Sequence, residues 1–181
     1  MRILIVSGDA GESLEIFYPK FRLEEEGWYV AIAAPEKRMF QSVVHDFEPG
    51  FDTYTEKLGY RVQADLALNE VDPTTFDALV LPGGRAPEYL RNNPDAIKIV
   101  QHFIELKKPI ATNCHGPLLL FAAGLESGRC MTGYPDLAID VVQSKTQYKN
   151  EPVVVDGNLV SVREWPDNSS WMREFVKLLK K

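Results

Sequence analysis

The chain has only two cysteines, Cys114 and Cys130, among its 181 residues. Two cysteines cannot form the dense disulfide framework of a small secreted domain, so we expect a reducing, cytoplasmic environment. No apolar run approaches the ~20 residues that cross a bilayer. The apolar run that follows Met1 is too short for a secretion signal. These absences predict a cytoplasmic protein with no membrane partner.

The chain also lacks an excess of basic residues, because 20 Lys and Arg stand against 26 Asp and Glu, a net charge of −6. Without a basic stripe there is no support for contacts to phosphates, so we expect no nucleic-acid partner. The hydrophobic share of 45% and the charged share of 25% are those of an ordinary globular protein. The length predicts one domain over residues 1–181.

Several site signatures are missing. Neither of the glycine-rich patterns that bind phosphate groups occurs. The three histidines, His45, His102 and His115, do not have metal-ligand spacing, so we expect no metal and no cofactor. No histidine follows residue 115, which argues against a glutamine-amidotransferase triad, whose base comes from a late strand. We interpret His45 as structural, with lining the site as the alternative, His102 as a surface or core residue of a helix, and Cys130 as a buried strand residue.

Apolar runs alternate with amphipathic segments from the first residue on. We predict strands over residues 2–7, 28–34, 77–81, 109–112 and 129–132, and a hairpin over 153–162. We predict helices over residues 13–26, 87–91, 94–107, 116–123, 135–143 and 168–181. In the first helix the expected buried stripe is Leu14, Phe17, Tyr18, Phe21 and Leu23. Residues 36–63 interrupt this alternation and form either a hairpin or a loop over one edge. The pattern predicts an α/β fold, a mostly parallel sheet with helices on both faces.

Cys114 lies between the strand predicted over 109–112 and the helix predicted over 116–123. A thiol at this turn has the position of a nucleophile elbow. The free N–H groups and the dipole of the helix N-terminus would lower the pKa of the thiol. Gly116, which has no Cβ, would let a substrate approach. The alternative is an inert buried thiol, as free cysteines usually are.

Two further segments end at the same edge of the predicted sheet. In the first, Glu12 and Glu15 are three residues apart, and either could hydrogen-bond a thiolate, act as a base, or simply stabilise the first turn of a helix. In the second, Leu81-Pro-Gly-Gly-Arg-Ala-Pro-Glu88, Gly83 or Gly84 could present an N–H to an oxyanion, or only form a turn. His115 could reach the thiol of the residue before it as a general acid or base.

These motifs together resemble the ThiJ/PfpI family. The matching stretches are the strand with Glu12-x-x-Glu15-x-x-Tyr18-Pro19, the stretch from Asp77 to Glu88, and Ala111-x-x-Cys114-His115-Gly116-Pro117. The resemblance covers essentially the whole chain. The 36–63 segment, with Val44-His-Asp-Phe and Asp52-Thr-Tyr, is most similar to the branch that includes glutathione-independent glyoxalases. Other members are described as intracellular proteases, deglycases or redox-responsive chaperones.

The resemblance implies a flavodoxin-like three-layer sandwich with Cys114 as the nucleophile. It implies Glu15 as the buried glutamate beside the thiol, with Glu12 and Gly83 as secondary candidates. His115 would be the acid/base, and the N–H groups of Gly84 and His115 the oxyanion donors. Glu88 would orient the histidine across a subunit interface, which implies self-association. The chain departs from the family pattern at Asn113 and at residues 164–167.

Three functions remain open at this point. The first is a glutathione-independent glyoxalase that converts a small 2-oxoaldehyde such as methylglyoxal to lactate through a Cys114 hemithioacetal. Its hydrogen shift is internal, so no redox cofactor is needed. The second is an intracellular cysteine peptidase or a protein deglycase with the same nucleophile. The third is a redox-sensing chaperone without turnover, in which Cys114 is oxidised.

Overall fold

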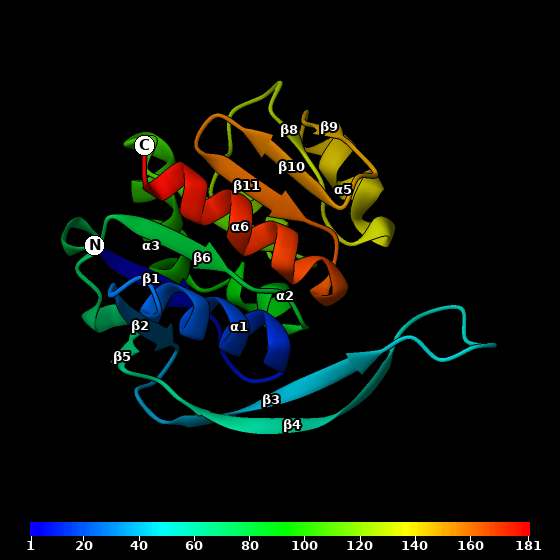
Figure 1. The fold of residues 1–181 in the computed structure, drawn as a ribbon, viewed down its shortest axis with the longest axis horizontal. Coiled ribbons are helices and arrows are strands. Elements are labelled where there is room, and N and C mark those ends of the chain that lie inside the picture. The colour runs from blue at the N-terminus through cyan, green and yellow to red at the C-terminus, as the bar shows by residue number, and fades with distance from the viewer.

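The computed structural model describes all of residues 1–181 and is built around a seven-stranded sheet (Figure 1). The strand order is β10-β11-β7-β6-β1-β2-β5. The bounds are β1 (Arg2–Val6), β2 (Tyr29–Ala34), β5 (Leu66–Ala67), β6 (Ala78–Leu81), β7 (Ile110–Asn113), β10 (Val153–Asp156) and β11 (Leu159–Val162). All neighbouring strands are parallel except the β10–β11 hairpin. The mostly parallel sheet is therefore confirmed, and β5 is an edge strand that the sequence analysis did not predict.

Helices cover both faces of the sheet. On one face α1 (Ser13–Glu24) and α6 (Asn168–Leu179) lie side by side (Figure 1). The other face carries α2 (Ala86–Leu90), α3 (Pro94–Glu105), α4 (Pro117–Ala122) and α5 (Ala138–Gln143). Single 3-10 turns occur at Leu68–Glu70, Pro73–Thr75, Pro135–Leu137 and Trp165–Asp167. This is the predicted flavodoxin-like three-layer architecture. None of the helices combines the length and the apolarity needed to cross a membrane.

The central strand β1 shows why its sequence is apolar at successive positions. Leu4 and Val6 belong to the apolar cluster under α3 and α4, whereas Ile3 and Ile5 belong to the cluster under α1 and α6. Successive side chains of a strand point to opposite faces, so a strand covered on both faces must be apolar throughout. This packing aligns the carboxyl ends of β1, β6 and β7, from which the candidate site is built.

Residues 36–63 form a separate antiparallel hairpin of β3 (Met39–Asp46) and β4 (Thr55–Gln63). Of the two predicted alternatives, the hairpin is confirmed. Figure 1 shows it running beside α1, with the loop at its tip extending beyond the helices. Phe40 and Val62 anchor it in the apolar cluster under α1 and α6. The hairpin thus reaches from the core to the carboxyl end of the sheet.

The predicted buried stripe of α1 is wrong in part. Leu14 is 47% exposed and Phe21 is 55% exposed, whereas Ile16 and Leu23 are buried as core residues. The helix turns its Glu15 side into the protein, and this rotation carries Leu14 and Phe21 outward. Glu15 is a polar residue that the apolar pattern could not include in a buried stripe.

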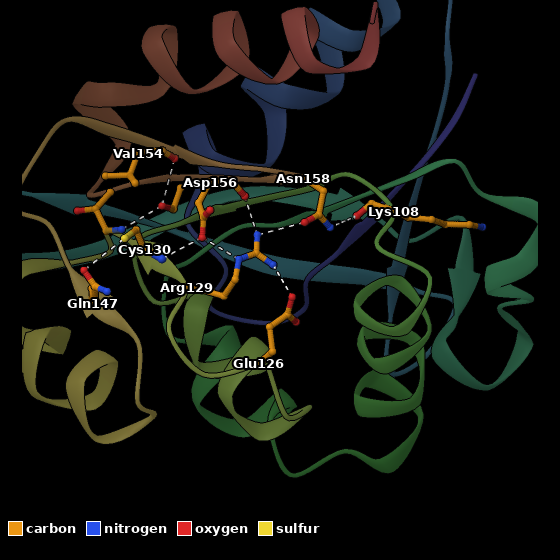
Figure 2. A network of polar contacts seen from close by, with 10 residues as sticks. Lys108, Glu126, Arg129, Cys130, Gln147, Val154, Asp156 and Asn158 are labelled. Carbon is orange, nitrogen blue, oxygen red and sulfur yellow. Dashed lines mark hydrogen bonds and ion pairs between the residues drawn. The ribbon is translucent and has the colours of Figure 1, made fainter.

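A polar network attaches a second small sheet, β8 (Cys130–Met131) with β9 (Gln147–Tyr148), to the edge strand β10. Figure 2 shows Arg129 at its centre, with Nε donating to Asp156 Oδ2 at 2.7 Å. The same oxygen accepts the N–H of Cys130 at 2.9 Å, and Arg129 also pairs with Glu126 at 3.0 Å. Cys130 is half-buried rather than buried, because the network holds it at the margin of the sheet.

Candidate active site

Cys114 stands at the turn between β7 and α4, as the sequence predicts for a nucleophile elbow. Its φ is +53°, a left-handed conformation that is unusual for a residue with a side chain. The Gly116 N–H closes the turn by donating to Asn113 O at 2.7 Å. A Cβ at Gly116 would collide with the carbonyl oxygen of Leu81, so only glycine fits there. The turn leaves the Cys114 side chain 4% exposed.

His115 lies against the thiol, with Nδ1 3.2 Å from Cys114 Sγ. Its ring stacks on Tyr134 with centroids 5.2 Å apart, and Tyr54 meets it edge-on at 6.0 Å. Burial lowers the pKa of His115 to about 4, with a further contribution from His45. The imidazole is therefore neutral near pH 7 and can accept a proton from the thiol or from a bound substrate.

Glu15 reaches the same thiol from α1. Its Oε2 accepts the Gly83 N–H at 2.7 Å, and a Cβ at Gly83 would touch both this oxygen and the Cys114 Cβ, so the carboxyl lies beside Cys114. Burial raises the pKa of Glu15 well above its usual value, and the nearby carboxylate of Glu12 raises it further. A protonated Glu15 can donate to the thiolate while it still accepts from Gly83.

The thiol itself differs from the sequence-based expectation of a lowered pKa. Burial raises the pKa of Cys114 well above its usual value, and an ionised Glu15 would raise it further. The N–H groups of Gly84 and His115 act on the sulfur and lower the pKa, but burial outweighs them. Two buried acids in contact do not both ionise, so Glu15 and Cys114 retain a proton between them.

Gly83 and Gly84 have different places in this arrangement. The N–H groups of Gly84 and His115 both lower the pKa of the Cys114 thiol, and their role as oxyanion donors stays a prediction. The N–H of Gly83 is occupied by Glu15. A Cβ at Gly83 would lie 2.5 Å from the Cys114 Cβ, so glycine is required for the close approach of the two turns.

Glu12 does not join the group that contacts the sulfur directly. It is the N-cap of α1, where its Oε2 accepts the Glu15 N–H at 2.8 Å. Its Oε1 is buried without a partner, and burial raises its pKa to about 7. Its charge raises the pKa of Glu15 and also contributes to raising that of Cys114.

Glu88, on the short helix α2, is not brought to His115 within the chain. The residue is exposed, and its carboxylate forms no hydrogen bond or ion pair. The role expected for it requires a second subunit and stays a prediction. No group of three or more His, Cys, Asp or Glu side chains is arranged to hold a metal ion.

The sequence analysis missed two aromatic residues of the site, Tyr54 and Tyr134. Tyr134 follows β8, and Tyr54 immediately precedes β4. Their rings meet edge-on at 5.3 Å. His45, expected to be structural, stacks on Tyr54 at 4.2 Å and so stands directly behind the site. A short apolar pattern cannot indicate loop aromatics of this kind, because their neighbours come from three distant segments.

Asn113 and residues 164–167, where the chain departs from the family pattern, both make structural contacts. Asn113 Nδ2 donates to Asn168 Oδ1 at 2.7 Å, so its amide joins β7 to α6 rather than facing the thiol. In the 164–167 segment, Trp165 Nε1 donates to His45 O at 2.9 Å, and its ring stacks on Phe47. That segment therefore supports the base of the hairpin tip.

The fold and the site together define an α/β protein with a nucleophile elbow, in which a buried thiol, an imidazole and a carboxyl converge. The sequence matches the DJ-1/PfpI family over residues 1–178, and the chain belongs to that family. It is 46% identical over 180 residues to a deglycase of Pyrococcus abyssi and 45% identical to the deglycase PfpI of Pyrococcus furiosus, covering 99% of this chain and 100% of each relative. It is 34% identical to the putative cysteine protease YraA of Bacillus subtilis, over 99% of this chain and 98% of that protein.

Solved structures agree on the architecture. A two-domain protein from Anabaena variabilis with a DJ-1/ThiJ/PfpI-like domain superposes with a TM-score of 0.86 at 29% identity, covering 99% of this chain and 50% of that one. DJ-1 of Schizosaccharomyces pombe superposes with a TM-score of 0.81 at 16% identity, covering 98% and 90%. The second similarity concerns the fold alone.

Proposed function

We propose that this chain is a cysteine-dependent deglycase, which releases 2-oxoaldehyde adducts from amino or thiol groups as 2-hydroxy acids. The observation that carries the proposal is the convergence of Cys114 Sγ, His115 Nδ1 at 3.2 Å and the Glu15 carboxyl under two N–H donors. Full-length relatives at 44–46% identity are named deglycases, which supports this choice among the reactions open to a thiol.

In the first step the Cys114 thiolate attacks the carbinol carbon of the adduct, where a sulfur–carbon bond forms and the bond to the modified nitrogen or sulfur breaks. The departing amine or thiol takes a proton, for which the Glu15 carboxyl is the nearest buried donor. The product of this step is a hemithioacetal on Cys114. The N–H groups of Gly84 and His115 stabilise its oxygen as charge develops there.

In the second step a proton moves between adjacent carbons of the bound aldehyde. The neutral His115 imidazole removes the proton from the carbinol carbon, giving an enediolate, and returns it to the former ketone carbon, while the hydroxyl proton on the carbinol carbon passes to the former ketone oxygen. The carbon on sulfur is thereby oxidised and its neighbour reduced, so no external electron acceptor is needed. Water then cleaves the thioester, which releases the 2-hydroxy acid and restores the Cys114 thiol.

A second candidate is turnover of free methylglyoxal, the glyoxalase reaction. The same hemithioacetal on Cys114 supports it, because the free aldehyde adds to the thiolate without a leaving group. The two functions differ only in whether the enzyme acts on the adduct or on the aldehyde that the adduct releases.

The test uses methylglyoxal with increasing N-acetylcysteine, so that the hemithioacetal rises while the free aldehyde is held constant. A deglycase gives a lactate rate that follows the hemithioacetal concentration. A rate that follows only the free aldehyde would favour the glyoxalase function. If no lactate forms at any N-acetylcysteine concentration, the deglycase and the glyoxalase functions are both refuted. Cys130→Ser is the matched control, because that thiol lies outside the site.

A further inference from the structure

The sulfur of Cys114 is closed off by aromatic side chains. The residue belongs to a small buried cluster with Leu118, Tyr134 and Leu137, and Tyr54 packs on the outside of it. None of the four cavities in the molecule is lined by Cys114. A substrate therefore has to displace a side chain before it can reach the nucleophile.

Tyr54 contacts three other ring side chains around the buried thiol. Its ring meets Tyr134 at 5.3 Å and His115 at 6.0 Å, both edge-on. On its other side it lies against His45 at 4.2 Å. These neighbours come from the loop after β8, from the elbow and from β3, so the Tyr54 ring fills the space where three segments meet.

A bridge of charged groups fixes this position of the ring. Glu56, two residues after Tyr54, accepts from Arg85 Nε at 2.7 Å and pairs with His45 Nε2 at 2.9 Å. Arg85 directly follows Gly84. The Glu56 carboxylate therefore links His45, on which Tyr54 stacks, to the turn that carries Gly84. The side chain of Glu56 is 30% exposed, which allows the bridge to open without unfolding the core.

A cavity of about 320 Å³ is lined by residues 47–53, which precede Tyr54 in the chain, and by Tyr134. Tyr134 belongs to this cavity and also to the cluster around Cys114. The cavity is thus joined to the cluster around Cys114 through Tyr134 and offers an open space from which a substrate can approach.

We infer that Tyr54 is a specificity-determining residue: its ring admits small aldehydes to Cys114 and restricts adducts carried on longer chains. This inference rests on the proposed function for its substrates. The closure itself is measurable without turnover, by the access of reagents to the thiol.

The test compares Cys114 labelling by N-ethylmaleimide and by fluorescein-5-maleimide, which share a reactive group but differ in size. In a Cys130→Ser background only Cys114 reacts, and a change in its pKa cancels in the ratio of the two rates. Tyr54→Ala should raise the rate of the large reagent relative to the small one by about tenfold or more, whereas Tyr54→Phe, which keeps the ring, should change it by less than about threefold. An unchanged ratio in folded Tyr54→Ala would overturn the inference.

Two additions keep the test decisive. If Tyr54→Ala does not fold, Tyr54→Leu keeps apolar packing while it removes the ring, and its ratio of labelling rates is judged in the same way.

Lactate formation is then measured from methylglyoxal and from a methylglyoxal-modified arginine peptide, with kcat/KM of the variant expected to shift towards the peptide. If labelling shifts but even the wild type forms no lactate, the proposed function fails and the closure stands. If the wild type forms lactate and labelling does not shift, only the inference fails.

Discussion

The carboxyl of Glu15 accepts a 2.7 Å hydrogen bond from the backbone N–H of Gly83, across 68 residues of sequence. The bond joins α1 to the turn after β6, and the Glu15 side of it is fully buried. Because one carboxyl oxygen is held in this way, the group is fixed in orientation towards Cys114. Glu15 therefore has a structural and a chemical part in the site, and the two can be separated by substitution.

Glu15→Gln keeps an oxygen that can accept from Gly83 but cannot deliver a proton. We expect kcat to fall by about 10²–10⁴-fold with little loss of stability, because only the proton transfer is removed. Glu15→Ala should in addition lose about 1–3 kcal/mol of unfolding free energy, since the Gly83 N–H is left buried and unpaired. Steady-state kinetics and urea unfolding measure the two effects. Wild-type turnover in Glu15→Gln would contradict the proposed role.

The second prediction concerns stability and pH. The pKa of Glu12 is raised from 4.5 to about 7, so its stabilising contribution is full below pH 4.5 and is lost as the pH rises through 7. His115, with its pKa lowered to about 4, has the opposite effect, which is lost as the pH falls from 6.5 to 4. Comparing Glu12→Gln with the wild type cancels the histidine, and the variant should gain about 2.5 kcal/mol relative to the wild type between pH 5 and pH 8.

Urea unfolding at several pH values gives this difference directly. Gln at position 12 still caps α1 by accepting the Glu15 N–H, so the comparison keeps the cap and removes the charge together with its effect on Glu15. A difference that does not vary with pH would mean that Glu12 titrates normally in the folded protein.

The third prediction concerns the amide pair Asn113 and Asn168. Asn113→Val should cost about 1–2 kcal/mol, because it removes the buried donor to Asn168 Oδ1. In a double-mutant cycle with Asn168→Ala the two effects should not add, since both remove the same bond. Turnover should stay close to wild type, because the amide faces α6. A loss of kcat without a loss of stability would instead place Asn113 in the chemistry.

The fourth prediction concerns the network in Figure 2. Asp156→Ala leaves Arg129 Nε and the Cys130 N–H without their shared acceptor and should cost about 1–3 kcal/mol. Glu36→Ala is the matched control, because that glutamate is 75% exposed in its pair with Arg38, and such pairs contribute about 0–1 kcal/mol. Equal effects of the two substitutions on the unfolding free energy would show that the network does not hold β8 to the sheet.

Much of the fold followed from local pattern. The alternation of apolar strands with helices predicted a mostly parallel sheet, and the short strand before Cys114 with the apolar helix after it predicted the elbow. The orientation of α1 was not predictable in this way, because its inward side is set by Glu15, whose burial depends on the Gly83 N–H. Short strands such as β5 and β9 have two residues each, too few for a periodic pattern.

The site was predictable where its residues share a turn or a helix end, as Cys114 and His115 do. The pKa of the Cys114 thiol was not predictable, because the N–H donors can be inferred from the sequence but the burial that outweighs them cannot. Tyr54 and Tyr134 were not predicted as site residues, because they meet only when the hairpin folds against the loop that follows β8.

The most direct measurement is lactate formation from the N-acetylcysteine hemithioacetal of methylglyoxal by Cys114→Ala, beside Cys130→Ser and the wild type. We expect Cys114→Ala to form lactate no faster than buffer and Cys130→Ser to match the wild type. Lactate formation by folded Cys114→Ala at the wild-type rate would contradict the central claim that the buried thiol at the elbow is the nucleophile.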